Sequence, residues 1–494
     1  MSTISTEVRS YGHLIDAKDV PAAGDFIERP SPGSGELVAR FAEGTAQDAQ
    51  DAIVAARRAF DEGPWPQLSG AERARVLLSM GEAIRARHEQ LARIDAEEVG
   101  KPIRLARGDI DGAIAQFEYA AALAHESHGD TYSNLGGDYL GVVVREPVGV
   151  AGLIVPWNFP ALIYAQKVPY ALAAGCSVVV KPSEFTSGSA LEISRLATEA
   201  GLPAGVLNVV TGYGSPVGQA LVDSPDVDFV SFTGSTATGQ RVAASAAATY
   251  KRVGLELGSK AANVVFADAD LEDAIDGALF AVFFNSGECC VSGSRLLVQE
   301  SIADAFIERL VQRAQQLHVG PPLEESADVG ALIHEDHAEK VLGYIDSAKQ
   351  EGARMLTGGR RMAGEHAAGI FVEPTIFDGV QPHMRIFREE IFGPVLSILR
   401  FTDVEEAIAL ANDTTYGLAN SVWTKNIDTA LRVTRALRSG MVWVNTTIDG
   451  GPQMPFGGVK SSGYGREMGR AGLEEYTELK SCVIRTGKRD PFYA

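Results

Sequence analysis

Short apolar runs alternate with helix-like segments through the middle of the chain, between residues 150 and 258. Apolar runs of this length are typical of strands buried on both faces of a parallel sheet. The expected strands are 152–155, 176–181, 206–210, 227–232 and 253–257. The expected helices between them are 160–173, 187–200, 216–222 and 236–247. This order predicts an α/β fold with a Rossmann-like, doubly wound domain.

A second alternating set follows between residues 263 and 444. Its clearest elements are helices 271–284 and 302–317, strands 294–299 and 440–445, and helices near Val404 and Asp428. This set predicts a second α/β domain.

The segment before residue 150 is expected to contribute helices and one exposed strand. Thr45 and Asp48 form the sequence pattern of a capping box, so a helix is predicted to begin there. An amphipathic helix is expected over 70–98. Residues 139–145 are rich in valine and predict a strand in an arm or a hairpin.

Length and charge narrow the class of protein. The chain has 494 residues, of which 45% are hydrophobic and 22% charged, so we expect a folded protein of at least two domains. The net charge of −20 disfavours binding to nucleic acid or to an anionic membrane. The uncharged stretch 147–166 is long enough for a membrane span, but it contains Pro156 and Pro160, which disfavour one. Residues 1–19 hold no apolar run of signal-peptide length, so we expect a cytoplasmic location.

The cysteines and histidines do not indicate a metal site. The 4 cysteines form neither a C-x-x-C pair nor a zinc-ligand spacing, and no disulfide framework is expected. His334 and His337 lie three residues apart without the second half of a metal motif, and we interpret them as solvated residues on a helix surface.

Cys290 and Glu256 are the candidate reactive residues. A thiol nucleophile and a carboxylate base are the minimum needed to form a covalent acyl-enzyme and then hydrolyse it. A lone cysteine is more often an inert buried residue. It becomes reactive where a helix amino terminus or a bound cofactor lowers the pKa of its thiol. The sequence therefore favours an enzyme.

Two glycine-rich segments lie where a strand is expected to end and a helix to begin. Residues 212–218 lack the spacing of the dinucleotide fingerprint, and 234–239 lack the lysine of a P-loop, so plain turns stay open. Helix amino termini at such positions can nevertheless bind a pyrophosphate. Lys181 and Glu184 could bond the hydroxyls of a ribose, and a carboxylate there favours NAD over NADP.

The chain resembles the NAD(P)-dependent aldehyde dehydrogenase superfamily over nearly its whole length. The resemblance is carried by Pro156-Trp157-Asn158-Phe159-Pro160, Lys181-Pro182-Ser183-Glu184, Phe232-Thr233-Gly234-Ser235-Thr236, Leu255-Glu256-Leu257-Gly258, Gly287-Glu288-Cys289-Cys290, Glu389-Glu390-Ile391-Phe392-Gly393-Pro394 and Pro455-Phe456-Gly457-Gly458.

The resemblance implies a role for each catalytic residue. Cys290 would attack the aldehyde to give a thiohemiacetal, and Asn158, with the Cys290 backbone N–H, would stabilise the oxyanion. Hydride transfer would leave a thioester, which Glu256 would hydrolyse by activating water. Lys167 and Glu467 match residues that relay protons. An ordinary turn role for Asn158 and an ion-paired Glu256 stay open.

The resemblance also implies a cofactor site for NAD, with NADP left open. The matching positions are Ile154, Pro156, Trp157, Lys181, Ser183, Glu184, Gly214, Gly218, Phe232, Ser235, Leu257, Gly258, Glu390 and Phe392. Ser259 departs from the usual second glycine after Glu-Leu-Gly, and Glu288 replaces the commoner glutamine.

The aldehyde pocket is expected to be more polar than in relatives, because Gln166 stands where many have tryptophan. The expected pocket residues are Phe159, Leu162, Ile163, Gln166, Phe284, Cys289, Val291, Asp449 and Phe456. This interpretation favours a small polar or amino aldehyde, such as betaine aldehyde or aminobutyraldehyde.

The family architecture implies a cofactor domain (1–124 and 148–256), a catalytic domain (257–445), a return segment (446–472) and an oligomerisation arm (125–147 and 473–494). A homo-oligomer, dimer or tetramer, is expected because an exposed strand edge pairs with a partner. A coenzyme A-acylating dehydrogenase and a cofactor-independent thioesterase or esterase stay open as alternatives. The former does not need Glu256, and the latter does not need the cofactor positions.

Overall fold

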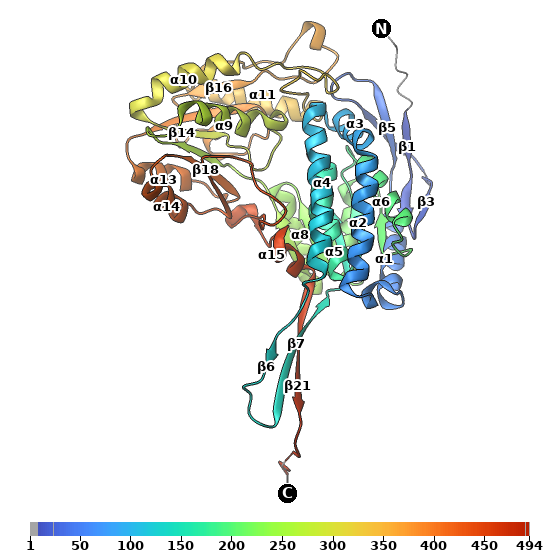
Figure 1. The fold of residues 1–494 in the computed structure, drawn as a ribbon. Helices are drawn as coiled ribbons and strands as arrows, with labels where there is room; N and C mark the ends of the chain where they lie inside the picture. The colour runs from blue at the N-terminus through green and yellow to red at the C-terminus, as the bar shows by residue number, and fades with distance from the viewer. Residues whose placement is uncertain (1–7, 23, 490, 494) are drawn as a thin grey trace.

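The computed structural model describes residues 8–22, 24–489 and 491–493. Two large sheets with their helices form the body of the molecule, and a long ribbon of β6, β7 and β21 projects from it (Figure 1). The α/β fold expected from the alternation of elements is confirmed.

The first large sheet has eight strands in the order β20-β12-β11-β8-β9-β10-β2-β3. The five central strands are parallel, β20 and β2 pair with them antiparallel, and the edge strand β3 pairs antiparallel with β2. The strands are β2 (His13–Ile15), β3 (Lys18–Val20), β8 (Val150–Ile154), β9 (Ser177–Lys181), β10 (Leu207–Val209), β11 (Phe229–Thr233), β12 (Arg252–Glu256) and β20 (Gly463–Tyr464). The chain returns beside β8 to form β11, so the carboxyl ends of β8 and β11 border a topological switch point, where α/β proteins bind ligands.

The helices of this half agree with the predictions except over 70–98. The capping box of Thr45 and Asp48 begins α1 as predicted. Two helices, not one, span 70–98, because Arg87 leaves helical geometry at ψ 19°. The helices are α1 (Ala46–Asp61), α2 (Gly70–Ala86), α3 (His88–Val99), α4 (Ile103–Ala124), α5 (Pro160–Ala174), α6 (Gly188–Glu199), α7 (Gln219–Asp223) and α8 (Thr236–Ala246). Helix α4 was not predicted.

The second large sheet has seven strands in the order β15-β16-β17-β14-β13-β18-β19. Its strands are β13 (Ala262–Val265), β14 (Arg295–Gln299), β15 (Arg354–Thr357), β16 (Thr375–Asp378), β17 (Val395–Phe401), β18 (Ala419–Trp423) and β19 (Met441–Val444). The helices of this half are α9 (Leu271–Phe283), α10 (Glu300–Ala314), α11 (Glu335–Gln350), α12 (Arg385–Arg388), α13 (Val404–Asn412) and α14 (Ile427–Ala436). Helix α15 (Gly469–Glu475) packs against α4 and α5 of the first half. Most apolar residues of these elements form two cores of their own, but Ala419 of β18 belongs to the main core of the first half.

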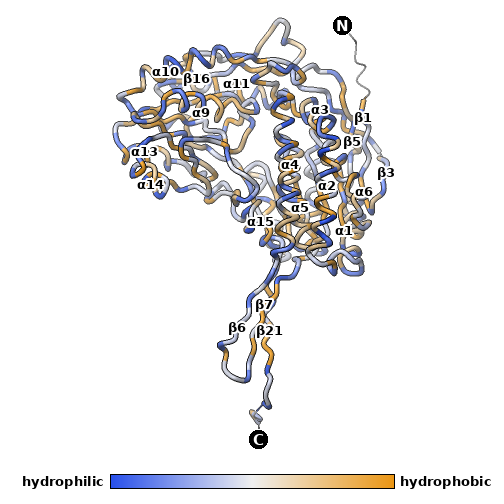
Figure 2. Tube along the Cα trace, in the orientation of Figure 1, coloured by the Kyte–Doolittle hydropathy of each residue, from blue (hydrophilic) through white to orange (hydrophobic). Residues whose placement is uncertain are grey.

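Two small sheets complete the fold. The first contains β1 (Arg9–Tyr11), β4 (Phe26–Pro30) and β5 (Leu37–Ala42), and the second contains β6 (Thr131–Tyr132), β7 (Tyr139–Pro147) and β21 (Thr477–Arg485). The strand predicted at 139–145 is confirmed as β7, which pairs along its length with β21. Apolar stretches lie on β7 and β21 of this ribbon, outside the body (Figure 2). Among the described residues, no helix is long and apolar enough to cross a membrane.

Candidate active site

Cys290 lies in a turn just after a short helical segment, Phe284–Gly287. Asn285 and Ser286 adopt left-handed φ values of 51° and 57°, and Gly287 follows with φ 77°. A Cβ on Gly287 would lie 2.2 Å from the Gly393 carbonyl oxygen, so only glycine fits there. The tight turn brings Cys290 beside the 389–394 motif, which is far away in the sequence.

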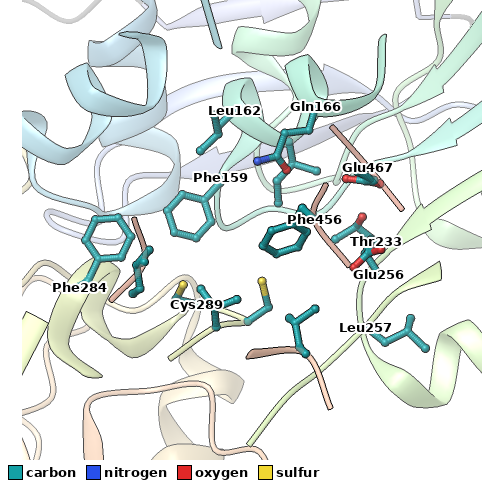
Figure 3. A pocket seen from close by; sticks show the side chains of 15 residues that line it. Phe159, Leu162, Gln166, Thr233, Glu256, Leu257, Phe284, Cys289, Phe456 and Glu467 are labelled. Atoms are coloured by element: carbon teal, nitrogen blue, oxygen red, sulfur yellow. The ribbon is translucent and has the colours of Figure 1, made fainter. Parts of the chain in front are cut away.

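Cys290 and Glu256 lie where two cavities meet. Both residues line a cavity surrounded by the predicted aldehyde-pocket residues and a second cavity beside Trp157 and Glu390. Figure 3 shows the first cavity, with Thr233, Glu256 and Glu467 on one side and Phe159 and Phe284 on the other. A thiol at such a junction can meet one ligand from each side.

Asn158 is held beside the turn that carries Cys290. Its side-chain Nδ2 donates to the Glu288 carbonyl oxygen at 3.0 Å, and Asn285 Nδ2 donates to the Asn158 carbonyl oxygen at 3.2 Å. Asn158 is 3% exposed and lines the second cavity together with Cys290. Since an amide nitrogen carries two hydrogens, one remains free to stabilise an oxyanion formed at the thiol.

Glu256 is a buried carboxyl at the end of β12, with 4% of its surface exposed. Its Oε2 has no hydrogen-bond partner among the described residues. Burial raises its pKa well above the usual value, the charge of Glu467 raises it further, and Lys167 opposes both effects. A carboxyl of raised pKa is suited to take and return protons near neutral pH.

Lys167, Ser231 and Glu467 form a buried cluster next to Glu256. Lys167 Nζ donates to Glu467 Oε1 and, at 2.7 Å, to Ser231 Oγ. Ser231 Oγ in turn donates to Glu467 Oε1 at 3.2 Å. Glu467 also lines the first cavity, so the cluster connects the cavity wall with the interior.

The expected lowering of the thiol pKa does not occur in the protein alone. Contact with the Cys289 side chain raises the Cys290 pKa well above its usual value, and burial and the carboxylates of Glu390 and Glu256 raise it further. Cys290 lies in a turn and not at a helix amino terminus, so no helix dipole opposes these effects.

The second cavity has an aromatic wall. The Trp157 ring meets the Phe392 ring edge to face with centroids 5.4 Å apart, and the His337 ring with centroids 5.7 Å apart. Glu390 lies across the segment after Glu256, where its Oε1 accepts from the Ser259 N–H at 2.7 Å. Of the positions predicted to bind the cofactor, Pro156, Trp157, Ser235, Leu257, Gly258, Glu390 and Phe392 line this cavity.

The other predicted cofactor positions lie at the carboxyl ends of neighbouring strands. Ile154 ends β8, Lys181 ends β9, and Phe232 belongs to β11. A Cβ on Gly218 would lie 3.8 Å from Ile154 Cδ1 and 3.9 Å from Lys181 Cδ, so these three residues are side by side. Ser183, Glu184 and Gly214 follow β9 and β10, and Lys181 Nζ donates to Glu184 Oε2 at 3.2 Å.

The first cavity is mainly apolar, which differs from the expected polar pocket. Its non-catalytic polar residues are Gln166 and Thr233, whereas Leu418 and Ile448 extend the apolar wall. All the predicted pocket residues except Asp449 line it. The Asp449 side chain is exposed, accepts from Thr446 Oγ1 at 2.8 Å and does not line this cavity.

The interpretation of His337 as a solvated surface residue was wrong. It is 8% exposed and lines the second cavity with Lys340, and its Nε2 lies 2.7 Å from the Phe392 carbonyl oxygen. His337 and Lys340 were not predicted as lining residues, because both belong to α11, which is remote in sequence from the other residues of this cavity. Ser231 carried a usable signal, since a polar residue in a fully buried strand requires a partner.

Glu288 precedes the cysteine pair and is 1% exposed. Its Oε1 accepts from the Ile333 N–H at 2.9 Å, and burial raises its pKa well above the usual value. When protonated, Glu288 would be neutral, like the glutamine that the family resemblance implies at this position.

Comparisons with known proteins identify the family. The sequence profile of the aldehyde dehydrogenase family matches residues 20–482. Betaine aldehyde dehydrogenase of Bacillus subtilis is 45% identical over 457 residues, covering 92% of this chain and 93% of the relative. Aldehyde dehydrogenase family 2 member C4 of Arabidopsis thaliana is 44% identical and covers 97% and 95%. The crystal structure of an NAD-dependent aldehyde dehydrogenase from Sinorhizobium meliloti superposes with TM-score 0.97 at 51% identity, covering 98% and 96%.

Proposed function

We propose, from the premise that the chain belongs to the aldehyde dehydrogenase family, that Cys290, Glu256 and Asn158 carry out its reaction. The protein is an NAD-dependent enzyme that oxidises an aldehyde to the carboxylic acid. The single observation that carries the assignment of these residues is the position of Cys290 and Glu256 at the junction of two cavities.

The first half of the reaction uses the Cys290 thiol and Asn158. The aldehyde enters the apolar cavity, the sulfur forms a bond to the carbonyl carbon, and the carbonyl oxygen becomes an oxyanion. The free Asn158 N–H and the Cys290 backbone N–H stabilise that oxyanion. The Cys290 thiol is partly exposed and loses its proton to water in the cavity, so this half of the reaction does not need Glu256.

The residues of the second cavity fit a dinucleotide cofactor. Trp157 and Phe392 supply flat apolar surfaces, and Glu390 supplies a carboxylate for ribose hydroxyls. Trp157, Phe392 and Glu390 would hold the nicotinamide end of NAD next to Cys290, and the bound cofactor would supply the hydride acceptor needed to turn the Cys290 adduct into a thioester. Lys181 and Glu184 would hold the distal ribose, and Glu184 disfavours a 2′-phosphate, so we propose NAD over NADP.

Glu256 completes the reaction by deacylation. It takes a proton from a water molecule, the hydroxide adds to the thioester carbon, and the carbon–sulfur bond breaks to release the acid. Lys167, Ser231 and Glu467 form a hydrogen-bonded cluster beside Glu256. Protons taken up by Glu256 can leave the buried site through this cluster.

Rapid-quench kinetics test these assignments. Cys290→Ala should abolish turnover, and Glu256→Gln should retain a burst of reduced cofactor while release of the acid becomes slow. Mass spectrometry of the quenched Glu256→Gln variant should find the acyl group on the peptide that contains Cys290. Steady oxidation by Cys290→Ala, or an acyl group on another residue, would contradict the proposal. Faster acid release with added coenzyme A than with water would favour an acylating dehydrogenase.

We also propose that the ribbon of β6, β7 and β21 joins copies of this chain into a dimer or tetramer. Its side chains include Leu479, Val483 and Ile484, which are 59%, 68% and 48% exposed. Apolar residues on an exposed strand pair are typical of a surface that a partner covers. Light scattering on the purified protein should give the mass of a dimer or tetramer, and a monomer would contradict the proposal.

We propose the division into domains that the family architecture implies. Residues 1–124 and 148–256 form the cofactor domain, 257–445 the catalytic domain and 446–472 the return segment, in which β20 joins the first sheet. Cytoplasmic location is proposed because all four cysteines are free thiols, which suits a reducing compartment.

A further inference from the structure

A small polar cavity next to Ser259 and Lys260, which follow the Leu255–Gly258 motif, has a cationic lining. It lies between Ser259-Lys260 and the loop that leads into β18, and Arg438 and Lys460 complete it. None of the described residues that line it is aspartate or glutamate. Every formal charge in the wall is therefore positive.

Lys260 is the central feature of this cavity. It is 1% exposed, and its Nζ has no hydrogen-bond partner among the described residues. Burying an ammonium group without a counter-charge is costly, so native proteins pair such groups. Burial, with help from Arg295, lowers the Lys260 pKa to about 7, which reflects the same missing partner.

Arg295 adds a second positive charge behind the wall. It is fully buried, and its guanidinium donates only to carbonyl oxygens, those of Lys260, Leu410 and Ala411, at 2.9, 3.0 and 2.8 Å. The Asp413 carboxylate acts on Arg295 through space but forms its ion pair with Arg388, at 2.6 Å. The two carboxylates that act on Lys260 through space, Glu390 and Glu389, form hydrogen bonds with other groups. Glu390 accepts from the Ser259 N–H, and Glu389 accepts from Tyr344 Oη at 2.8 Å.

We propose that this cavity binds a small inorganic anion of the size and charge of chloride, with Lys260 Nζ as its main ligand. One negative charge compensates the unpaired ammonium, and the hydroxyl groups of Ser259 and Thr414 lie in the same wall as further donors. The amide nitrogens of Asn412 and Asn420 each donate one hydrogen, to the Ala436 carbonyl and to Ser439 Oγ, and each keeps a second hydrogen. The small size of the cavity suits a compact anion.

The anion site would stabilise the segment that carries the catalytic base. Ser462 Oγ donates to the Gly258 carbonyl oxygen at 2.7 Å and accepts from the Gly417 N–H at 2.9 Å, which ties the segment to the cavity wall. Leu418 lines both this cavity and the aldehyde cavity. Anion binding should consequently raise the stability of the folded enzyme.

Bromide is the probe for the first experiment, because it scatters anomalously and resembles chloride. Crystals of the full-length enzyme soaked in sodium bromide should show an anomalous peak within hydrogen-bonding reach of Lys260 Nζ. Absence of bromide from this cavity, in crystals that bind it elsewhere, would overturn the proposal.

Thermal unfolding in solution gives the second experiment. The wild-type Tm should be higher in sodium chloride than in sodium gluconate of equal ionic strength, because gluconate is too large to enter, and should rise with chloride concentration. Lys260→Met should lose this difference and unfold in gluconate no earlier than the wild type, since methionine removes the unpaired charge. Lys460→Gln should require more chloride for the same rise.

The matched control is Lys18→Met, because the Lys18 side chain is 78% exposed and distant in sequence from the cavity. This variant should keep the full response to chloride. An equal chloride response in Lys260→Met and in the wild type would contradict the proposal, whether or not either protein oxidises aldehydes.

Discussion

Gly457 leaves the space that the Glu256 carboxyl occupies: a Cβ on Gly457 would lie 2.7 Å from Glu256 Oε1. Gly457 also has φ 154°, a value that residues with a side chain rarely adopt. The position of the proposed base therefore depends on a glycine that is remote from it in the sequence.

Gly457→Ala should displace Glu256 and slow deacylation by up to about a hundredfold, which is within the usual contribution of a general base. The burst of reduced cofactor should remain, because the first half of the reaction does not require water activation. Gly450→Ala is the control, since Gly450 has φ 140° but an added Cβ meets nothing within 4 Å. Equal acid release in both variants would show that Gly457 does not position Glu256.

Cys289→Ala should make Cys290 easier to ionise. The neighbouring Cys289 side chain is the largest cause of the raised Cys290 pKa, so its removal should move the pH dependence of alkylation to lower pH. The measurement is the rate of Cys290 modification by iodoacetamide against pH in the cofactor-free enzyme, followed by peptide mass spectrometry. Cys482→Ala should leave the profile unchanged, and an unchanged profile in Cys289→Ala would refute this explanation.

Lys167→Met should destabilise the enzyme by about 3–5 kcal/mol, because it leaves the Glu467 carboxylate buried without its partner. Denaturant unfolding measures the loss. The double variant Lys167→Met/Glu467→Leu should recover much of it, since two apolar side chains leave no charge unpaired. If the losses of the two single variants simply add, the pair is not coupled.

An aldehyde with a quaternary ammonium group should be a better substrate than its neutral isostere. The rings of Phe159, Phe284 and Phe456 line the aldehyde cavity, and such rings attract cations by about 0.5–2 kcal/mol. The kcat/KM for betaine aldehyde should therefore exceed that for 3,3-dimethylbutanal, which has the same shape without the charge, by roughly 2–30-fold. A preference for the neutral compound would indicate a purely apolar pocket.

The alternation of apolar runs and helices was sufficient to predict both α/β halves. Buried parallel strands such as β8 and β9 consist of nearly continuous apolar residues, and this local pattern does not depend on the rest of the fold. Helix α4 was missed because alanine-rich segments have little contrast between their faces. Arg87 breaks the predicted helix 70–98 without any glycine or proline to signal it.

Contacts between distant segments could not be predicted in the same way. His337 looked like a surface residue because its helix has a polar sequence, yet the fold places its ring against Trp157. Asp449 looked like a pocket residue because it stands in the loop before Pro455, yet its side chain accepts from Thr446 and does not line the cavity. In both cases the local sequence does not determine which side chains face the cavity, because that depends on how distant segments pack together.

The sequence by itself determined the chemical groups and their order: a thiol, a carboxyl and an amide, each placed at the end of an element whose type depends on nearby residues. Only the tertiary structure decided how those groups ionise and which of them meet. The pKa of Cys290 and Glu256 depends on burial and on charges from Glu390 and Glu467. Burial and through-space charge arise only when remote segments pack together, so no local pattern of residues can encode them.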